Sequence, residues 1–214
     1  PTFKRCIFDH TMYFSLRNIN NPNLRLIVLI GFMFAANFAK ADHYFGGYFY
    51  YEQISNQKIK ITLVTYTDVH KKNSDRDSVL FNWGDGELSY LNRENNAGQG
   101  EEIYHGVLKN LYTGTHEYNR FSNYRSFFSD NFRLFDVRNF GVGKSGVTNL
   151  RFDALVAVQD SSDYCQNNSP KPQVDPYFFA TEGEAFSLNF GYYDADGDSM
   201  EFKLTPCKQA NGST

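Results

Sequence analysis

The feature that most constrains the fold is a series of short runs in which apolar and polar residues alternate, with turns rich in glycine, asparagine or aspartate between them. In residues 58–66 (KIKITLVTY), Ile59, Ile61 and Leu63 fall on one face of an extended chain. A similar period recurs in residues 78–87, 131–140 and 148–158, and it is typical of a β-strand with one buried face. No stretch after residue 41 combines a helical period with helix caps. We therefore expect an all-β fold, an antiparallel β-sandwich.

Residues 24–41 (LRLIVLIGFMFAANFAKA) have the parts of a secretory signal peptide. Arg25 gives the positive flank, an apolar run follows, and Ala39-Lys40-Ala41 fits a cleavage site. The apolar run is shorter than the roughly 20 residues that a membrane-spanning helix needs, although an N-terminal anchor helix is the alternative. Residues 1–23 would then be an upstream segment, which could be spurious, and the mature chain is expected to be exported without a transmembrane segment.

Charge narrows the classes of partner. The chain carries a net charge of −3, and removing residues 1–41 takes away five basic and one acidic residue, which leaves −7. An acidic exported chain has little attraction for nucleic acid or anionic lipid. It is suited to recruiting divalent cations.

Composition shifts divide the chain further. Residues 42–158 contain the recurrent strand patterns and are expected to form a first sandwich. Residues 159–176 are polar, include three prolines and read as a linker. Alternation resumes at Phe186, Leu188 and Phe190, and again at Met200, Phe202 and Leu204. Residues 177–214 therefore read as the opening part of a second, truncated sandwich in a longer protein.

Between these last two runs lies an acidic turn, DADGD, that is a candidate calcium site. Asp194, Asp196 and Asp198 alternate around Gly197, and Glu182 could add a ligand. Calcium takes six to eight oxygen ligands, so backbone carbonyls would have to contribute as well. The spacing is not that of an EF-hand loop. The alternative is a solvated acidic turn between two strands.

Two cysteines of the mature chain are a disulfide candidate. Cys165 and Cys207 flank the acidic turn, and in an exported protein such a pair is more often a disulfide than a metal or catalytic site. Either cysteine could instead pair with one in another part of a longer chain.

No catalytic residue is nominated. The histidines have no metal-ligand spacing, GVGKSG (141–146) has Arg138 where a phosphate-binding loop needs glycine, and no G-x-S-x-G elbow occurs. The aromatic run HYFGGYFYYEQ (43–53) could bind a glycan by ring stacking. Burial of both faces of a strand in an aromatic-rich sandwich is the favoured explanation, because core burial explains most aromatic residues.

Three resemblances add to these expectations. EGEAFSLNFGYYDADGDSMEFKL resembles the cadherin-like and immunoglobulin-like repeats of bacterial surface proteins. In calcium-binding cadherins such acidic residues bind calcium between successive domains. WGDG (83–86) followed by THEY (115–118) resembles a PKD-type sandwich, in which Asp85 and Gly86 fill the turn and His116 and Tyr118 match the following strand signature. The chain departs from that family where NRFSNYRSFF (119–128) replaces the usual PGPGTY turn.

Taken in order, HYFGGYFYYEQISNQKIKITLVTYTD, NWGDGE, EIYHGVLKNLYTGTHEY and DADGDS are similar to the N-terminal region of exported Bacteroidota proteins with a gliding motility-associated C-terminal domain. This resemblance spans roughly residues 42–204 and implies type IX secretion to the cell surface, in association with the outer membrane. From the sequence as a whole we expect a non-catalytic, structural or adhesive role, with other domains of the same chain, a surface protein or a glycan as partner. The alternative is a carbohydrate-binding accessory module of an exported hydrolase.

Overall fold

A computed structural model describes residues 44–71, 75–131, 133–134, 149–160 and 166–206 of the 214-residue chain. The predicted signal peptide, the upstream segment, Cys165 and Cys207 lie outside these residues. So does nearly all of the run at 131–140.

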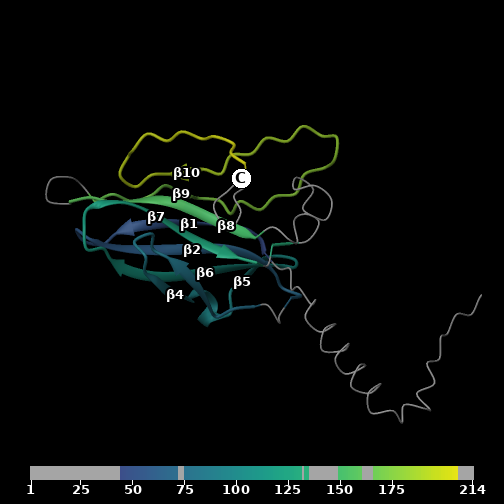
Figure 1. Ribbon diagram of the computed structural model, residues 1–214. Helices are drawn as coiled ribbons and strands as arrows, with labels where there is room; N and C mark the ends of the chain where they lie inside the picture. The colour runs from purple at the N-terminus through teal and green to yellow at the C-terminus, as the bar shows by residue number, and fades with distance from the viewer. Residues whose placement is uncertain (1–43, 72–74, 132, 135–148, 161–165, 207–214) are drawn as a thin grey trace, which may run out of the picture. The chain divides into compact units, whose positions relative to one another are not determined.

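The described part is built mainly from strands, and the pairings between the named strands are antiparallel (Figure 1). Tyr44 also makes an isolated parallel bridge with Arg133, and a short 3-10 helix spans Asn95–Gly98. One sheet has the order β1-β2-β6-β4-β3-β7-β8, with β5 also paired to β6, and a two-stranded sheet pairs β9 with β10. The strands are β1 Tyr44–Gln53, β2 Lys58–Asp68, β3 Ser78–Asn82, β4 Leu88–Arg93, β5 Glu101–Tyr104, β6 Val107–Glu117, β7 Ser122–Asp130, β8 Leu150–Val158, β9 Lys171–Pro172 and β10 Tyr192–Tyr193. The expectation of an all-β, antiparallel fold is confirmed.

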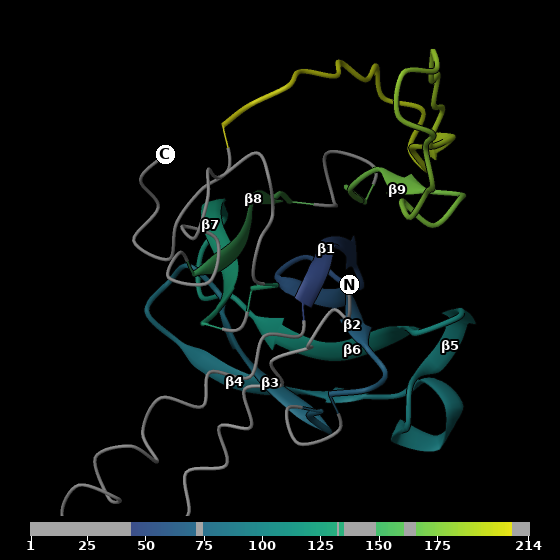
Figure 2. The ribbon, with the colours of Figure 1, turned by 90° about the vertical axis from the view of Figure 1, so that its right-hand side faces the viewer.

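The strand order is that of a Greek key. In a seven-stranded immunoglobulin-type sandwich, strands A, B, E and D form one sheet and C, F and G the other. Naming the strands A to G along the chain, with β5 left aside, gives β1-β2-β6-β4 and β3-β7-β8, which is the observed order with β4 joined to β3. The sheet curls so that β8 lies against β1, as the two views show (Figure 2).

The main core lies inside this curled sheet, and β2 supplies it as its alternation predicts. Ile59, Ile61 and Leu63 are fully buried there, together with Phe81 and Trp83 from the 78–87 run. Each such side chain contributes about 2 kcal/mol through burial of its apolar surface. The period-two pattern therefore identified the core face of β2 correctly.

The turn after β3 is fixed by its own side chains. The Asn82 carboxamide oxygen accepts the Gly84 N–H (2.9 Å), and Asp85 Oδ1 accepts the Glu87 N–H (3.0 Å). Gly84 has φ +88°, and a Cβ there would lie 2.7 Å from the backbone of Arg125. Only glycine fits this position, because the positive φ and the close approach of β7 both exclude a side chain.

The histidine and tyrosine of the PKD-type signature pack against this turn. Asp85 Oδ2 lies 2.7 Å from His116 Nε2, and the His116 ring stacks on Trp83 with centroids 4.9 Å apart. The buried Tyr118 hydroxyl donates to the Trp83 carbonyl oxygen (2.9 Å). The PKD-type signature predicted that His116 opens a strand. His116 instead lies near the end of β6. The motif thus marks a set of contacts that join the turn after β3 to the C-terminal end of β6.

The segment that departs from the PKD-type pattern forms a different corner. Tyr124 lies near the start of β7, and its hydroxyl donates a hydrogen bond to the carbonyl oxygen of Arg120 (2.9 Å). A tyrosine near the start of strand F that bonds back to the backbone is a hallmark of immunoglobulin-type sandwiches. Residues 119–128 therefore supply a hydrogen-bonded corner without the expected PGPGTY turn.

Residues 177–206 do not contain the predicted strands. Only Tyr192–Tyr193 is a strand, and the runs at 186–190 and 200–204 have no paired backbone among the described residues. Phe186, Phe202 and Leu204 are exposed. Alternation supplies an apolar face, but a strand also needs a neighbour for its backbone, and the described residues provide none. No described helix is long and apolar enough to cross a membrane.

Candidate functional site: a strap along strand β1

Strand β1 is buried on both faces, which accounts for its aromatic residues. Phe49 and Tyr51 join the main core. Tyr48 and Tyr50 point to the other side and pack into a second cluster with Val64, Tyr66, Val107 and Tyr177. The aromatic run at 43–53 is therefore a two-sided core element.

Residues 166–179, which we call the strap, run along the edge of β1 that faces away from β2. The Tyr51 N–H donates to Ser169 Oγ (2.8 Å), and the Ser169 N–H donates to the Tyr51 carbonyl oxygen (3.0 Å). The Gln53 N–H donates to Asn168 Oδ1 (3.0 Å). These bonds satisfy backbone groups that an edge strand would otherwise present to solvent. The residues predicted as a free linker are fastened to the sheet here.

The Gln53 side chain holds the start of the strap. Its Nε2 donates to the carbonyl oxygens of Gln159 (2.7 Å) and Asn56 (2.9 Å), while its Oε1 accepts the Asn167 N–H (3.1 Å). Gln53 is only 2% exposed. A buried amide with both ends satisfied fixes the geometry of the groups that it joins.

A second attachment lies farther along the strap, at Asp175. Its Oδ1 accepts the Tyr66 hydroxyl (2.7 Å) and lies 2.6 Å from Lys109 Nζ. Burial, reinforced by the hydrogen bond to the Asp175 carboxylate, raises the pKa of Tyr66. The phenol therefore stays protonated and remains a donor at physiological pH.

The strap ends in a group of aromatic rings. Tyr177 contacts Phe45 (centroids 5.9 Å apart) and Tyr104 (6.1 Å), and Phe179 contacts Tyr104 (5.0 Å). Tyr104 is 52% and Phe179 64% exposed. This aromatic patch is partly open to solvent, over β5 and the start of β1.

The acidic turn is connected to the strap. Asp194 Oδ1 accepts the N–H groups of Asp196 (2.9 Å) and Asp198 (3.2 Å), and Gly197 has φ +81°. The Asp196 carboxylate accepts the Asn168 N–H (2.5 Å) and its Nδ2 (2.9 Å). Two of the four predicted calcium ligands, Asp194 and Asp196, thus already accept hydrogen bonds that shape the turn and join it to the strap.

The structure does not gather the full predicted ligand set. Asp194 is 6% exposed, whereas Asp196, Asp198 and Glu182 are exposed. The described residues contain no group of three acidic, histidine or cysteine side chains arranged to hold a metal ion. Calcium at this turn stays a prediction, as does the pairing of Cys165 with Cys207.

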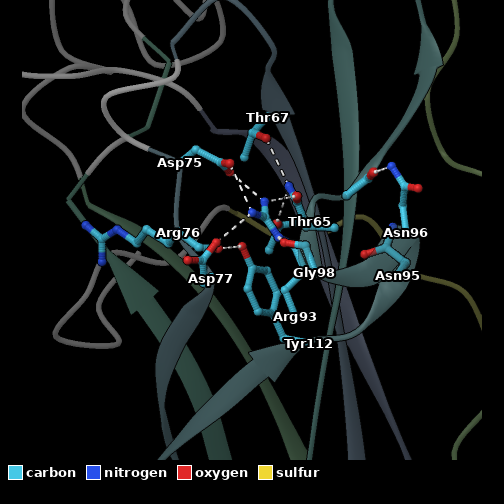
Figure 3. A network of polar contacts seen from close by, with 12 residues as sticks. Thr65, Thr67, Asp75, Arg76, Asp77, Arg93, Asn95, Asn96, Gly98 and Tyr112 are labelled. Atoms are coloured by element: carbon cyan, nitrogen blue, oxygen red, sulfur yellow. Dashed lines mark hydrogen bonds and ion pairs between the residues drawn. The ribbon is translucent and has the colours of Figure 1, made fainter.

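A separate polar network surrounds Arg93 at the end of β4 (Figure 3). Its Nε donates to the Gly98 carbonyl oxygen (2.6 Å). One terminal nitrogen donates to Asp75 Oδ1 (2.6 Å) and Asn110 Oδ1 (2.8 Å), and the other to Asp75 Oδ2 (3.0 Å) and Asp77 Oδ1 (3.1 Å). All five guanidinium N–H groups have an acceptor.

This network joins β4, β6 and the loops before β3 and after β4. Burial lowers the pKa of Arg93, but the hydrogen bond and charge of Asp75, with Asp77, outweigh burial and raise it. Asn110 Nδ2 in turn donates to Thr67 Oγ1 (2.9 Å). A neighbouring cavity of about 320 Å³ is lined by the same aspartates. Because Arg93 occupies these carboxylates, the arrangement anchors the loops before β3 and after β4.

Comparisons of the chain with protein-family models, curated proteins and solved structures find no match. The strap is the feature that sequence reasoning missed. Gln53, Asn168, Ser169 and Asp175 are ordinary polar residues, and the bonds that join the strap to β1 and β2 link residues more than 100 positions apart in the chain. The only signal was the polar, proline-containing composition of 159–176, which is equally typical of a free linker.

Proposed function

We propose that this chain is a non-catalytic, structural and adhesive module of an exported cell-surface protein. The strap is the observation that carries the proposal. After β8 the chain returns along β1, where it is bonded through Gln53 and Tyr51, and it is bonded to Tyr66 of β2 before it continues. A spacer built of consecutive modules needs such a junction, because a flexible linker would let the modules move independently.

The sequence supports the same proposal from another direction. Residues 24–41 have the features of a signal peptide, and the remaining chain is acidic, with a charge of −7. The partners proposed are other domains of the same longer chain and a surface protein or glycan. Type IX secretion and association with the outer membrane belong to the proposal through the resemblance to exported Bacteroidota proteins.

Surface labelling and a deletion test this function in the cells that produce the protein. An epitope inserted in the exposed turn at Gly183 should be detected on intact cells, and deleting residues 44–206 in frame should reduce attachment. Gly183 suits the insertion because a side chain there would meet nothing within 4 Å and the turn lies outside the main core. An epitope found only after lysis, or attachment unchanged by the deletion at an equal surface level, would contradict the proposal.

The aromatic patch favours one alternative, a carbohydrate-binding accessory module. Tyr104 and Phe179 expose more than half of their surface while remaining in ring contact. Exposed aromatic faces can stack on sugar rings. Retention on polysaccharide gels that falls when Tyr104 and Phe179 are both changed to alanine would support this alternative. Tyr90→Ala is the control, since Tyr90 is 67% exposed on β4, outside the patch.

A further inference from the structure

We infer that the strap is released by tension: when the chain is pulled, the strap detaches from β1 before the main core opens. This inference rests on the proposed function, since a surface spacer is the setting in which the chain carries load. It concerns a property of the strap itself and can be tested on the isolated protein.

The direction of the strap decides how it responds to load. Asn168 meets Gln53, Ser169 meets Tyr51 and Tyr177 meets Phe45. The strap is therefore antiparallel to β1, and its far end lies beside the beginning of β1. Tension applied through these two neighbouring ends separates the contacts one after another, from Tyr177 towards Asn168. Contacts loaded in sequence fail at lower force than contacts loaded together.

The other edge of β1 is held more extensively. β1 is in register with β2 from Tyr44↔Thr67 to Gln53↔Ile59, and Phe49 and Tyr51 are part of the main core. The strap has only separated attachments, and part of each is accessible to solvent. Regions with few buried contacts open before regions with many.

The acidic turn, which is C-terminal to the strap, adds a further attachment on the side where load is applied. Tyr192–Tyr193 of β10 pairs with Lys171–Pro172 of β9, and the Gln173 N–H donates to the Gly191 carbonyl oxygen (3.2 Å). The Asp196 carboxylate closes this arrangement on Asn168. Load applied beyond residue 206 therefore reaches the Asp196–Asn168 contact and the β9–β10 pair before it reaches the bonds to β1.

Single-molecule stretching of the full chain between two handle domains, one at each end, tests the inference. The buffer contains EGTA so that calcium plays no part. We expect an early event at low force that lengthens the chain by on the order of 100 Å, because about 40 residues are freed at up to about 3.6 Å each. A larger event at higher force should follow when the core opens.

Three substitutions identify the early event. Asp196→Asn should lower its force, and Ser169→Ala should do the same, while neither should change the force of the later event. Asp198→Asn is the matched control, since it removes the same charge from the same turn but no side-chain bond to the strap. Circular dichroism establishes beforehand that each variant is folded.

A single event that frees the strap and the core together would overturn the inference. Equal effects of Asp196→Asn and Asp198→Asn on the early event would also overturn it. If the early event behaves as expected while the in-cell deletion leaves attachment unchanged, the release of the strap under tension is supported and the adhesive function is contradicted.

Discussion

Arg93 shows how one buried side chain can organise two loops that are distant in sequence. It joins Asp75 and Asp77, which precede β3, to Gly98 in the loop after β4 and to Asn110 on β6. Asn110 is fully buried, so losing the guanidinium would leave its oxygen without a partner. An unsatisfied buried polar group destabilises a protein more than an exposed one, because water cannot replace the lost bond.

Arg93→Met should therefore lower the free energy of unfolding by about 3 kcal/mol. Urea denaturation followed by tryptophan fluorescence measures this, since Trp83 is buried in the main core. Lys203→Met is the control, because the Lys203–Glu201 ion pair is exposed and such pairs contribute little. Equal losses in the two variants would contradict a structural role for the Arg93 network.

Asp85 carries a second residue-scale prediction, on pH. Burial tends to raise its pKa, but hydrogen bonds from the Glu87 N–H and from His116 outweigh burial and hold the pKa below its ordinary value of 3.8. The carboxylate therefore contributes stability above its unfolded pKa, and this contribution is lost as the pH falls through the lower, folded pKa. Asp85→Asn should flatten the loss of stability below about pH 4, a range set by the ordinary carboxylate pKa.

Urea denaturation at several pH values between 2 and 7 compares this variant with the wild type. Asp198→Asn is a suitable control, since its exposed side chain makes no contact with the β3 turn. If Asp85→Asn leaves the slope of stability against pH unchanged, the Asp85–His116 contact does not contribute in solution.

At the scale of the element, β1 is distinguished by the space on its two sides. It lies between β2 on one edge and the strap on the other, and it also contacts β8. Its two adjacent glycines differ sharply in their surroundings. A Cβ on Gly47 would collide with the Val64 carbonyl oxygen and lie 2.8 Å from the Phe152 ring, whereas a Cβ on Gly46 would meet nothing within 4 Å.

Gly47→Ala should destabilise the protein by about 2 kcal/mol, because packing an extra group into a filled site forces neighbours to move. Gly46→Ala is the matched control and should change stability little, since alanine suits a strand at least as well as glycine. Thermal unfolding followed by circular dichroism measures both variants. Equal melting temperatures for the two would show that β1 is not confined between β2 and Phe152.

The strap is the element where local and long-range information diverge most. Residues 159–176 look like a linker, because nothing in their own composition indicates a partner. The partner is the edge of β1, more than 100 residues earlier, and the bonds depend on the curl that brings the two together. No local pattern encodes such a contact, because it depends on where two distant backbones meet.

At the scale of the whole molecule, calcium binding at the acidic turn stays a prediction. The described contacts leave Asp194 Oδ2 and the Asp198 carboxylate without a hydrogen bond, while Asp196 is held by Asn168. A cation would therefore bind Asp194 and Asp198 together with carbonyl oxygens, or compete with Asn168 for Asp196. The second route would loosen the strap.

Millimolar calcium should raise the melting temperature of the full chain relative to EGTA, since a ligand that binds the native state stabilises it. Asp198→Asn should abolish the increase without changing the melting temperature in EGTA. Magnesium at the same concentration is the control, because it needs a stricter octahedral site than calcium. An unchanged melting temperature would contradict calcium binding, and the acidic turn would then act only through its hydrogen bonds to the strap.

The sequence by itself determined the fold class, the core face of β2 and the turn after β3. The alternation of Ile59, Ile61 and Leu63 and the turn conformation of WGDG depend on neighbours in the chain, so a local pattern suffices. The close approach of Arg125 to Gly84 is decided by the tertiary structure. Only the tertiary structure decided that Asp196 binds Asn168, that the strap covers β1, and that the apolar runs at 186–190 and 200–204 stay unpaired. Those outcomes depend on which backbones come within hydrogen-bonding distance after the sheet has curled, and alternation alone does not specify that distance.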